Sequence, residues 1–129
     1  MLQVLDALAA WRRSVITGLS VTHALSSDAA SVALPASTLA ARPLGQFVLP
    51  VCVDLEVTET VSVEAQGSEE HAALTAIVAS LRSLSGKARL ASTDAARIHS
   101  HVLVSEVPGK DENQRRQVVL TWKVVASWA

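Results

Sequence analysis

The sequence predicts an α+β domain with a largely antiparallel sheet of about four strands and two helices packed on one face. Three observations indicate this class. An amphipathic helical segment opens the chain, a well-bounded helix lies near its centre, and alternating, strand-like segments flank that second helix on both sides. One helix between two groups of strands, with a closing hairpin, is the order typical of an α+β sandwich.

The first helix is expected at 2 to 17, where apolar residues recur at helical spacing. The stripe consists of Val4, Leu5, Leu8, Trp11 and Val15. Gly18 ends the helix. A short strand is expected next, at 19 to 25.

Residues 26 to 46 are rich in Ala, Ser and Pro and show no regular period. Pro35, Pro43 and Gly45 argue against a continuous helix there. The segment is therefore predicted to be a long loop, and loops of this length inside compact domains often carry function.

The most unusual feature is a long alternating strand at 51 to 63. Its apolar face consists of Val51, Val53, Leu55, Val57, Val61 and Val63. Glu59 is the one exception on that face, and we interpret it as a bulge or as the point where the strand leaves the core. At ~3.3 Å per residue the strand would span about 43 Å, so its far end, residues 57 to 64, is expected to project and pair with a neighbour.

The second helix is predicted at 68 to 85. Gly67 breaks the strand, Ser68 is a good N-cap, and Glu69 and Glu70 follow in the first turn, where the helix dipole favours negative charge. The helix stripe consists of Leu74, Ile77, Val78, Leu81 and Leu84. Gly86 suits a left-handed C-terminal cap.

Two further strands close the chain, at 96 to 107 and 117 to 129, joined by a charged hairpin loop at 108 to 116. The first is expected to place Ile98, Val102 and Val104 on one face. The second is expected to do so with Val118, Leu120, Trp122, Val124 and Ala126. Whether the strands at 47–63 and 96–107 run parallel stays open at this point.

Length and composition indicate one domain over residues 1–129 with a substantial core. No apolar run approaches the ~20 residues that a membrane helix needs. Asp6 precedes Arg12 and Arg13 at the start, the reverse of a secretion signal, and Cys52 is the only cysteine. We therefore expect no membrane segment and assembly in a reducing cytoplasm. A net charge of −1 and few aromatic residues give no case for nucleic-acid recognition.

Candidates for chemistry are few. His99 and His101 lie two apart on a strand, the spacing of two metal ligands, but we interpret them as residues of a wet sheet face. Asp54 and Glu56 resemble paired carboxylates, for which a solvated face is the plainer interpretation, and no local sequence supports Cys52 as a nucleophile. We expect no enzyme activity, no cofactor and no metal.

A resemblance covers nearly the whole chain. The opening "MLQVLDALAAWRRSV", the segment "PLGQFVLPVCVDLEV", the helix "SEEHAALTAIVASLRSL" and the ending "RRQVVLTWKVVASWA" after a charged hairpin occur in that order. This order resembles the tail terminator, or tail-completion, proteins of tailed bacteriophages. The similarity is one of pattern, and the Ala/Ser/Pro-rich segment and the long strand depart from it.

The resemblance implies structural work in the virion. Family members form a ring, usually a hexamer, that caps the tail tube and joins it to the head connector. Subunits of such a ring would meet through charged and apolar residues of the strands, which we expect to be buried or paired across the interface. The hypothetical interface residues are Asp54, Glu56, Glu59, Val61, Val63, Arg115, Arg116 and Lys123. The alternative for the charged ones is that they pair within one subunit or not at all.

Three alternatives stay open. The chain is also compatible with another phage neck or tail connector component. It is compatible with a small α+β ligand-binding domain or enzyme, which would place a concave apolar site between sheet and helices. A cellular assembly adaptor is the third alternative.

Overall fold

A computed structural model describes residues 1–24, 35–49, 52–63, 68–110 and 115–128. The elements are α1 (Leu2–Val15), β1 (Ser20–His23), β2 (Ala36–Leu49), β3 (Cys52–Ser62), α2 (Ser68–Arg82), the 3-10 turn η1 (Ala88–Ala91), β4 (Ala96–Lys110) and β5 (Arg116–Trp128). The strands form one sheet of five, in the order β1-β2-β3-β5-β4. The α+β class is confirmed, but the sheet has five strands, one more than the four or so that the sequence predicted.

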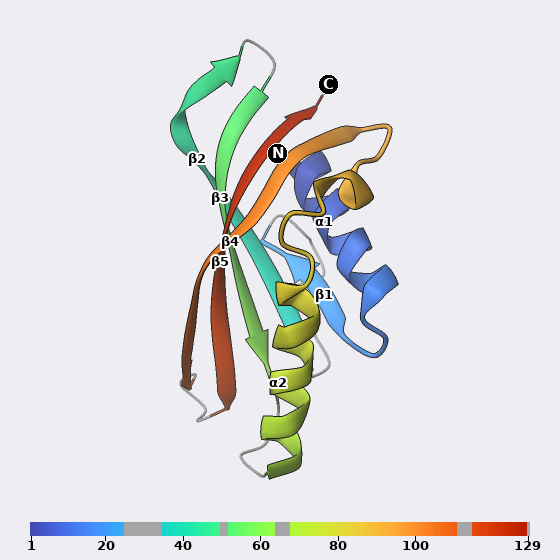
Figure 1. The fold of residues 1–129 in the computed structure, drawn as a ribbon, viewed down its shortest axis with the longest axis vertical. Coiled ribbons are helices and arrows are strands. Elements are labelled where there is room, and N and C mark those ends of the chain that lie inside the picture. Colours follow the sequence, from blue (N-terminus) through green and yellow to red (C-terminus); the bar gives the residue numbers. More distant parts are fainter. Residues whose placement is uncertain (25–34, 50–51, 64–67, 111–114, 129) are drawn as a thin grey trace.

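Figure 1 shows a long, twisted sheet with α1 and α2 on the same side. The face toward the helices is the covered face, and no helix or strand of the described chain lies over the other, the open face. Strand β1 is parallel to β2, and the other neighbouring pairs are antiparallel. Because β3 and β4 are each antiparallel to β5, they run in the same direction with β5 between them, which answers the question left open by the sequence.

The additional strand is β2, which occupies much of the segment expected to be a loop. That expectation is wrong for residues 36–46, and residues 26–34 lie outside the described ranges. Strand β3 pairs with β2 along its length and β1 pairs with its first four residues, so the Ala- and Ser-rich sequence is held as a strand by its neighbours. Pro43 is accommodated where the pairing register with β3 shifts, between Pro43 and Phe47.

Both helices bury the predicted stripes. In α1 only Val15 departs, being 46% exposed. All of the predicted α2 stripe is buried, and the chain turns at Gly86, which has the positive φ of +81° expected of a left-handed cap. The buried apolar residues of both helices and of the covered face join in one cluster. Within the described ranges, neither helix is long and apolar enough to cross a membrane.

Strand β3 keeps its alternation without interruption. Its pairing with β5 is continuous from Val53 to Ser62, so Glu59 marks neither a bulge nor an exit from the core, and that interpretation is wrong. Val61 and Val63 are buried within the subunit, so the expectation that a partner buries them is wrong as well. The long strand β3 lies inside the sheet, because it pairs with β2 on one side and with β5 on the other.

Strand β4 contains two register shifts, between Ile98 and Ser100 and between Leu103 and Ser105. Each shift changes which residues face the helices, because side chains alternate strictly in a regular strand. Ile98 and His101 are therefore both buried, whereas Val102 and Val104 are exposed. The expectation that Ile98, Val102 and Val104 share one face is wrong for this reason.

Candidate functional site

The predicted interface residues separate into a buried group and a surface group. Glu59, Val61 and Val63 lie inside the subunit. Their side chains point to the covered face, beneath the helices, so they offer no surface to a neighbour. Asp54, Glu56, Arg115 and Arg116 are partly exposed, and Lys123 is exposed.

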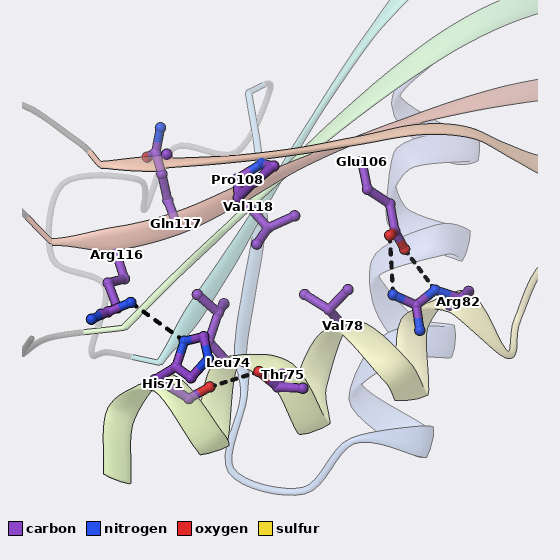
Figure 2. Close-up of a pocket in the computed structure, with 11 residues that line it drawn as sticks. His71, Leu74, Thr75, Val78, Arg82, Glu106, Pro108, Arg116, Gln117 and Val118 are labelled. Carbon is purple, nitrogen blue, oxygen red and sulfur yellow. Dashed lines mark hydrogen bonds and ion pairs between the residues drawn. The ribbon is translucent and has the colours of Figure 1, made fainter. Parts of the chain in front are cut away.

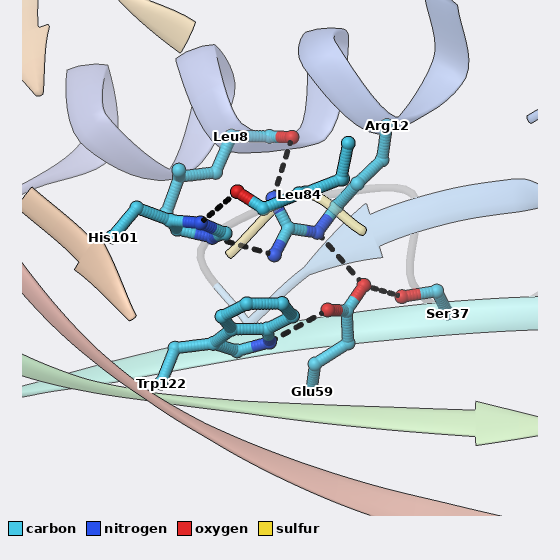
Figure 3. A network of polar contacts seen from close by, with 7 residues as sticks. All are labelled: Leu8, Arg12, Ser37, Glu59, Leu84, His101 and Trp122. Carbon is cyan, nitrogen blue, oxygen red and sulfur yellow. Dashed lines mark hydrogen bonds and ion pairs between the residues drawn. The ribbon is translucent and has the colours of Figure 1, made fainter. Parts of the chain in front are cut away.

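Glu59 belongs to a buried polar cluster, which consists of Arg12, Ser37, Glu59, His101 and Trp122. Arg12 Nε donates to Glu59 Oε2 at 2.9 Å, and the Ser37 hydroxyl donates to the same oxygen. Trp122 Nε1 donates to the other carboxylate oxygen, Oε1, at 2.9 Å. Figure 3 shows how α1, β2 and β5 each contribute a side chain that bonds the Glu59 carboxylate of β3. A buried carboxylate with three donors is fully satisfied, which is why it can remain in the core.

His101 extends the cluster toward the end of α2. Arg12 Nη2 donates to His101 Nε2 at 3.1 Å, because a guanidinium has only donors, and His101 Nδ1 lies 3.3 Å from the Leu84 carbonyl oxygen. The imidazole stacks on the Trp122 ring at 4.1 Å. Burial, and next the Arg12 charge, lower the pKa of His101 to about 3, against the weaker raising effect of the Leu84 bond. The ring is therefore neutral, with its proton on Nδ1.

The buried polar cluster lies in the interior of the subunit. Of its members, Trp122 lines one of the two surface depressions described below, whereas Arg12, Glu59 and His101 line neither. The cluster ties α1 to four strands of the sheet. The sequence indicated this buried polar cluster through two charged residues at apolar positions. Arg12 lies four residues after Leu8 on the apolar stripe of α1, and Glu59 lies on the apolar face of β3.

The two strand histidines do not share a side. His99 is exposed and its Nε2 lies 2.9 Å from Ser127 Oγ, whereas His101 is buried. The register shift of β4 separates them, so the interpretation of both as surface residues is wrong for His101. Within the described ranges, no group of His, Cys, Asp or Glu side chains is placed to hold a metal ion.

Of the remaining predicted charges, Glu56 makes an ion pair within the subunit. Arg42 Nε donates to Glu56 Oε1 at 2.9 Å on the open face. This hydrogen bond lowers the pKa of Glu56 and raises that of Arg42. Lys123 lies opposite Glu56 in the β3–β5 register, and Asp54 lies opposite Val125. Asp54, Glu56 and Lys123 therefore lie on the open face, whereas Arg116 lies on the covered side, beside α2.

The open face carries an apolar row along β4. Val102, Val104 and Val107 are 45%, 63% and 58% exposed. A depression of about 190 Å³ lies beside Val104, and Leu44 of β2 contributes to its other side. Residues 85–93 cover the free edge of β4 along the half of the strand nearer its start. Gly86 N, for example, donates to the His101 carbonyl oxygen at 2.8 Å. The exposed valines lie largely beyond that covered part.

A second depression, of about 270 Å³, lies on the other side of the sheet, between α2 and the β4–β5 hairpin (Figure 2). Its floor contains Leu74, Val78 and Val118. Two polar contacts bridge it. Arg82 bonds both carboxylate oxygens of Glu106, at 2.8 and 3.0 Å, and Arg116 Nη1 lies 3.4 Å from His71 Nδ1. We call this depression the α2 groove.

Comparison with known proteins gave no assignment. No protein-family model matches the chain, and no curated protein matches it.

Proposed function

We propose that this chain is a structural subunit that forms a ring with copies of itself, as the resemblance to tail terminators implies, and that the subunits meet through the open face of the sheet. The observation that carries the proposal is the row formed by Val102, Val104 and Val107. A half-covered antiparallel sheet normally presents polar side chains to water, so a row of exposed valines favours contact with another protein.

The composition of the neighbouring positions supports the same conclusion. The open face beside Val107 carries uncharged side chains, those of Thr58, Thr60, Val119 and Thr121. Charged side chains flank the other end of the row, where Lys123 lies opposite Val102 and both Glu56 and Lys123 line the depression beside Val104. An apolar centre with charges at its rim is the usual anatomy of a protein–protein interface.

The sheet also ends in two different edges, β1 and β4. A contact between unlike surfaces is heterologous and closes into a ring when the rotation between subunits permits it. In the proposed virion the ring lies between the tail tube protein and the head connector protein. The resemblance in the order of elements supplies this placement, and a hexamer is the stoichiometry that it implies.

Light scattering coupled to size-exclusion chromatography tests the proposal. The wild-type chain should elute as a hexameric ring, and the double variant Val104→Lys, Val107→Lys should elute as a folded monomer. Val15→Lys is the matched control, because Val15 is a comparably exposed valine on α1. A wild-type monomer or dimer, or a ring that survives both β4 lysines, would contradict the proposal.

A ligand-binding domain or an enzyme is the second candidate, favoured by the α2 groove. The groove is apolar at its floor and lies between sheet and helix, where such a site was expected. Its volume of about 270 Å³ falls at the lower limit of the range typical of small-molecule sites.

A further inference from the structure

The α2 groove contains an arginine whose bonding is incomplete. Arg116 Nε is buried and has no hydrogen-bond partner, and within the described ranges the contact of Arg116 Nη1 is a long one, at 3.4 Å from His71 Nδ1. Arg82, at the other end of the groove, by contrast already donates through Nε and Nη2 to both oxygens of Glu106. The two arginines differ in what they can still bind, so an added anion would go to Arg116.

A carboxylate is the anion that fits a guanidinium best. The planar fork of N–H donors matches two carboxylate oxygens, and charge makes these hydrogen bonds stronger than neutral ones. Arg116 is only half-buried and lines the groove, so its guanidinium can turn toward a ligand there. Leu74, Val78 and Val118 supply an apolar floor beside it, as Figure 2 shows.

The shape of the groove favours an extended chain. Its lining runs along α2 from His71 to Arg82, which corresponds to about 16 Å at 1.5 Å per residue. A volume of about 270 Å³ spread over that length leaves a narrow channel. An extended peptide of about five residues covers the same distance.

We propose that the α2 groove binds an extended segment of a partner protein in which a carboxylate side chain is flanked by apolar side chains. The carboxylate bonds Arg116, and the apolar neighbours lie on Leu74, Val78 and Val118. The groove is on the covered side of the sheet, opposite the valine row of β4. The inference therefore goes beyond the proposed ring and does not depend on it.

Titration of ¹⁵N-labelled protein by NMR tests the inference with blocked pentapeptides, acetyl-Gly-X-Asp-X-Gly-amide, in which X is Leu, Val or Phe. The matched peptides carry Asn in place of Asp. Binding of at least one Asp peptide should shift the resonances of the groove residues and of Arg116 Nε–H. The Asn counterpart should bind about tenfold more weakly, as expected when one charged contact is lost.

Two variants assign the effect. Arg116→Gln should abolish the preference for Asp over Asn, whereas Arg97→Gln should retain it, because Arg97 is an exposed arginine at the start of β4. The variant Val104→Lys, Val107→Lys should bind the Asp peptides as the wild type does. That result separates the groove from the proposed ring, since either can fail alone.

Three outcomes would overturn the inference. One is that no Asp peptide binds at millimolar concentration. Another is that the binding is not that of the groove, either because Asp and Asn peptides bind equally or because the shifted resonances belong to open-face residues. The third is that groove resonances change with protein concentration alone and cease to do so in Arg116→Gln, which would make a second copy of the chain the occupant.

Discussion

Arg12 and Glu59 are opposite charges that lie fully buried in an otherwise apolar core. Each was visible in the sequence as a charged residue at an apolar position, one on a helix and one on a strand. A buried charge is tolerated only with a partner, so the two exceptions together predict an ion pair between α1 and β3. Interpreting Glu59 alone led instead to a bulge, because its partner lies 47 residues away.

Glu59→Gln is expected to lower the free energy of unfolding by ~3–5 kcal/mol, because it leaves the Arg12 charge buried without a counter-charge. Adding Arg12→Met should restore part of the loss, since glutamine can still bond Ser37 and Trp122 and methionine fills the arginine's space. Urea titration of both variants and of Arg12→Met alone gives the coupling. Additive effects of the two substitutions would show that the side chains do not act as a pair.

His101 is expected to make stability depend on pH in the acidic range. Its pKa is about 3 in the fold, whereas an unfolded histidine titrates near 6.5. Between these values the unfolded chain binds a proton that the folded chain does not, so the free energy of unfolding falls as pH falls, by about 1 kcal/mol per pH unit. Above pH 6.5 this contribution is constant.

Denaturant titrations between pH 4 and 7 measure that slope. His101→Gln should reduce it by about the contribution of one histidine, while an amide oxygen can still accept from Arg12. His99→Gln is the control, because His99 is exposed two residues away and should leave the slope unchanged. Equal slopes in the wild type and His101→Gln would mean that His101 is protonated in the folded protein.

Among the elements, those with strong local signals could be predicted and those defined by pairing could not. Helix α2 has an N-cap residue, an apolar stripe and a C-terminal glycine within its own sequence, and its predicted face is buried. Strand β2 has only weak local preference and exists because β1 and β3 pair with it. The register shifts of β4 reverse the faces after Ile98, and alternation alone does not reveal them.

Leu81→Ala tests the packing of α2. Leu81 is fully buried at the centre of the helix stripe, so truncation should cost ~2–5 kcal/mol of unfolding free energy through lost burial and a residual cavity. Ala79→Ser changes an exposed position two residues away and should have little effect. A urea titration in which Leu81→Ala shifts the midpoint no more than Ala79→Ser would place the core elsewhere.

At the scale of the whole molecule, the sheet separates two environments. The covered face packs against α1 and α2 (Figure 1). The open face carries threonines, valines and a few charges, and no helix or strand of the described residues covers it. The long strand suggested a projecting ribbon, but the structure places that length inside the sheet, as the strand between β2 and β5. The contact surface that we propose therefore lies across the strands of the open face instead of at the end of one strand.

Two adjacent residues of β3 distinguish these environments. Val61 is fully buried on the covered face, whereas Thr60 is partly exposed on the open face, opposite Val119. Val61→Lys should unfold the protein or destabilise it by several kcal/mol, because the core around it offers the ammonium no described partner. Thr60→Lys should leave the circular dichroism spectrum and thermal midpoint nearly unchanged and weaken assembly, because it places charge beside the apolar row of β4. Circular dichroism with sedimentation velocity measures folding and assembly for each variant.

If Val61→Lys stays folded while Thr60→Lys unfolds, the assignment of the two faces is wrong. If Thr60→Lys is folded and still forms the wild-type oligomer, subunits do not meet through this face.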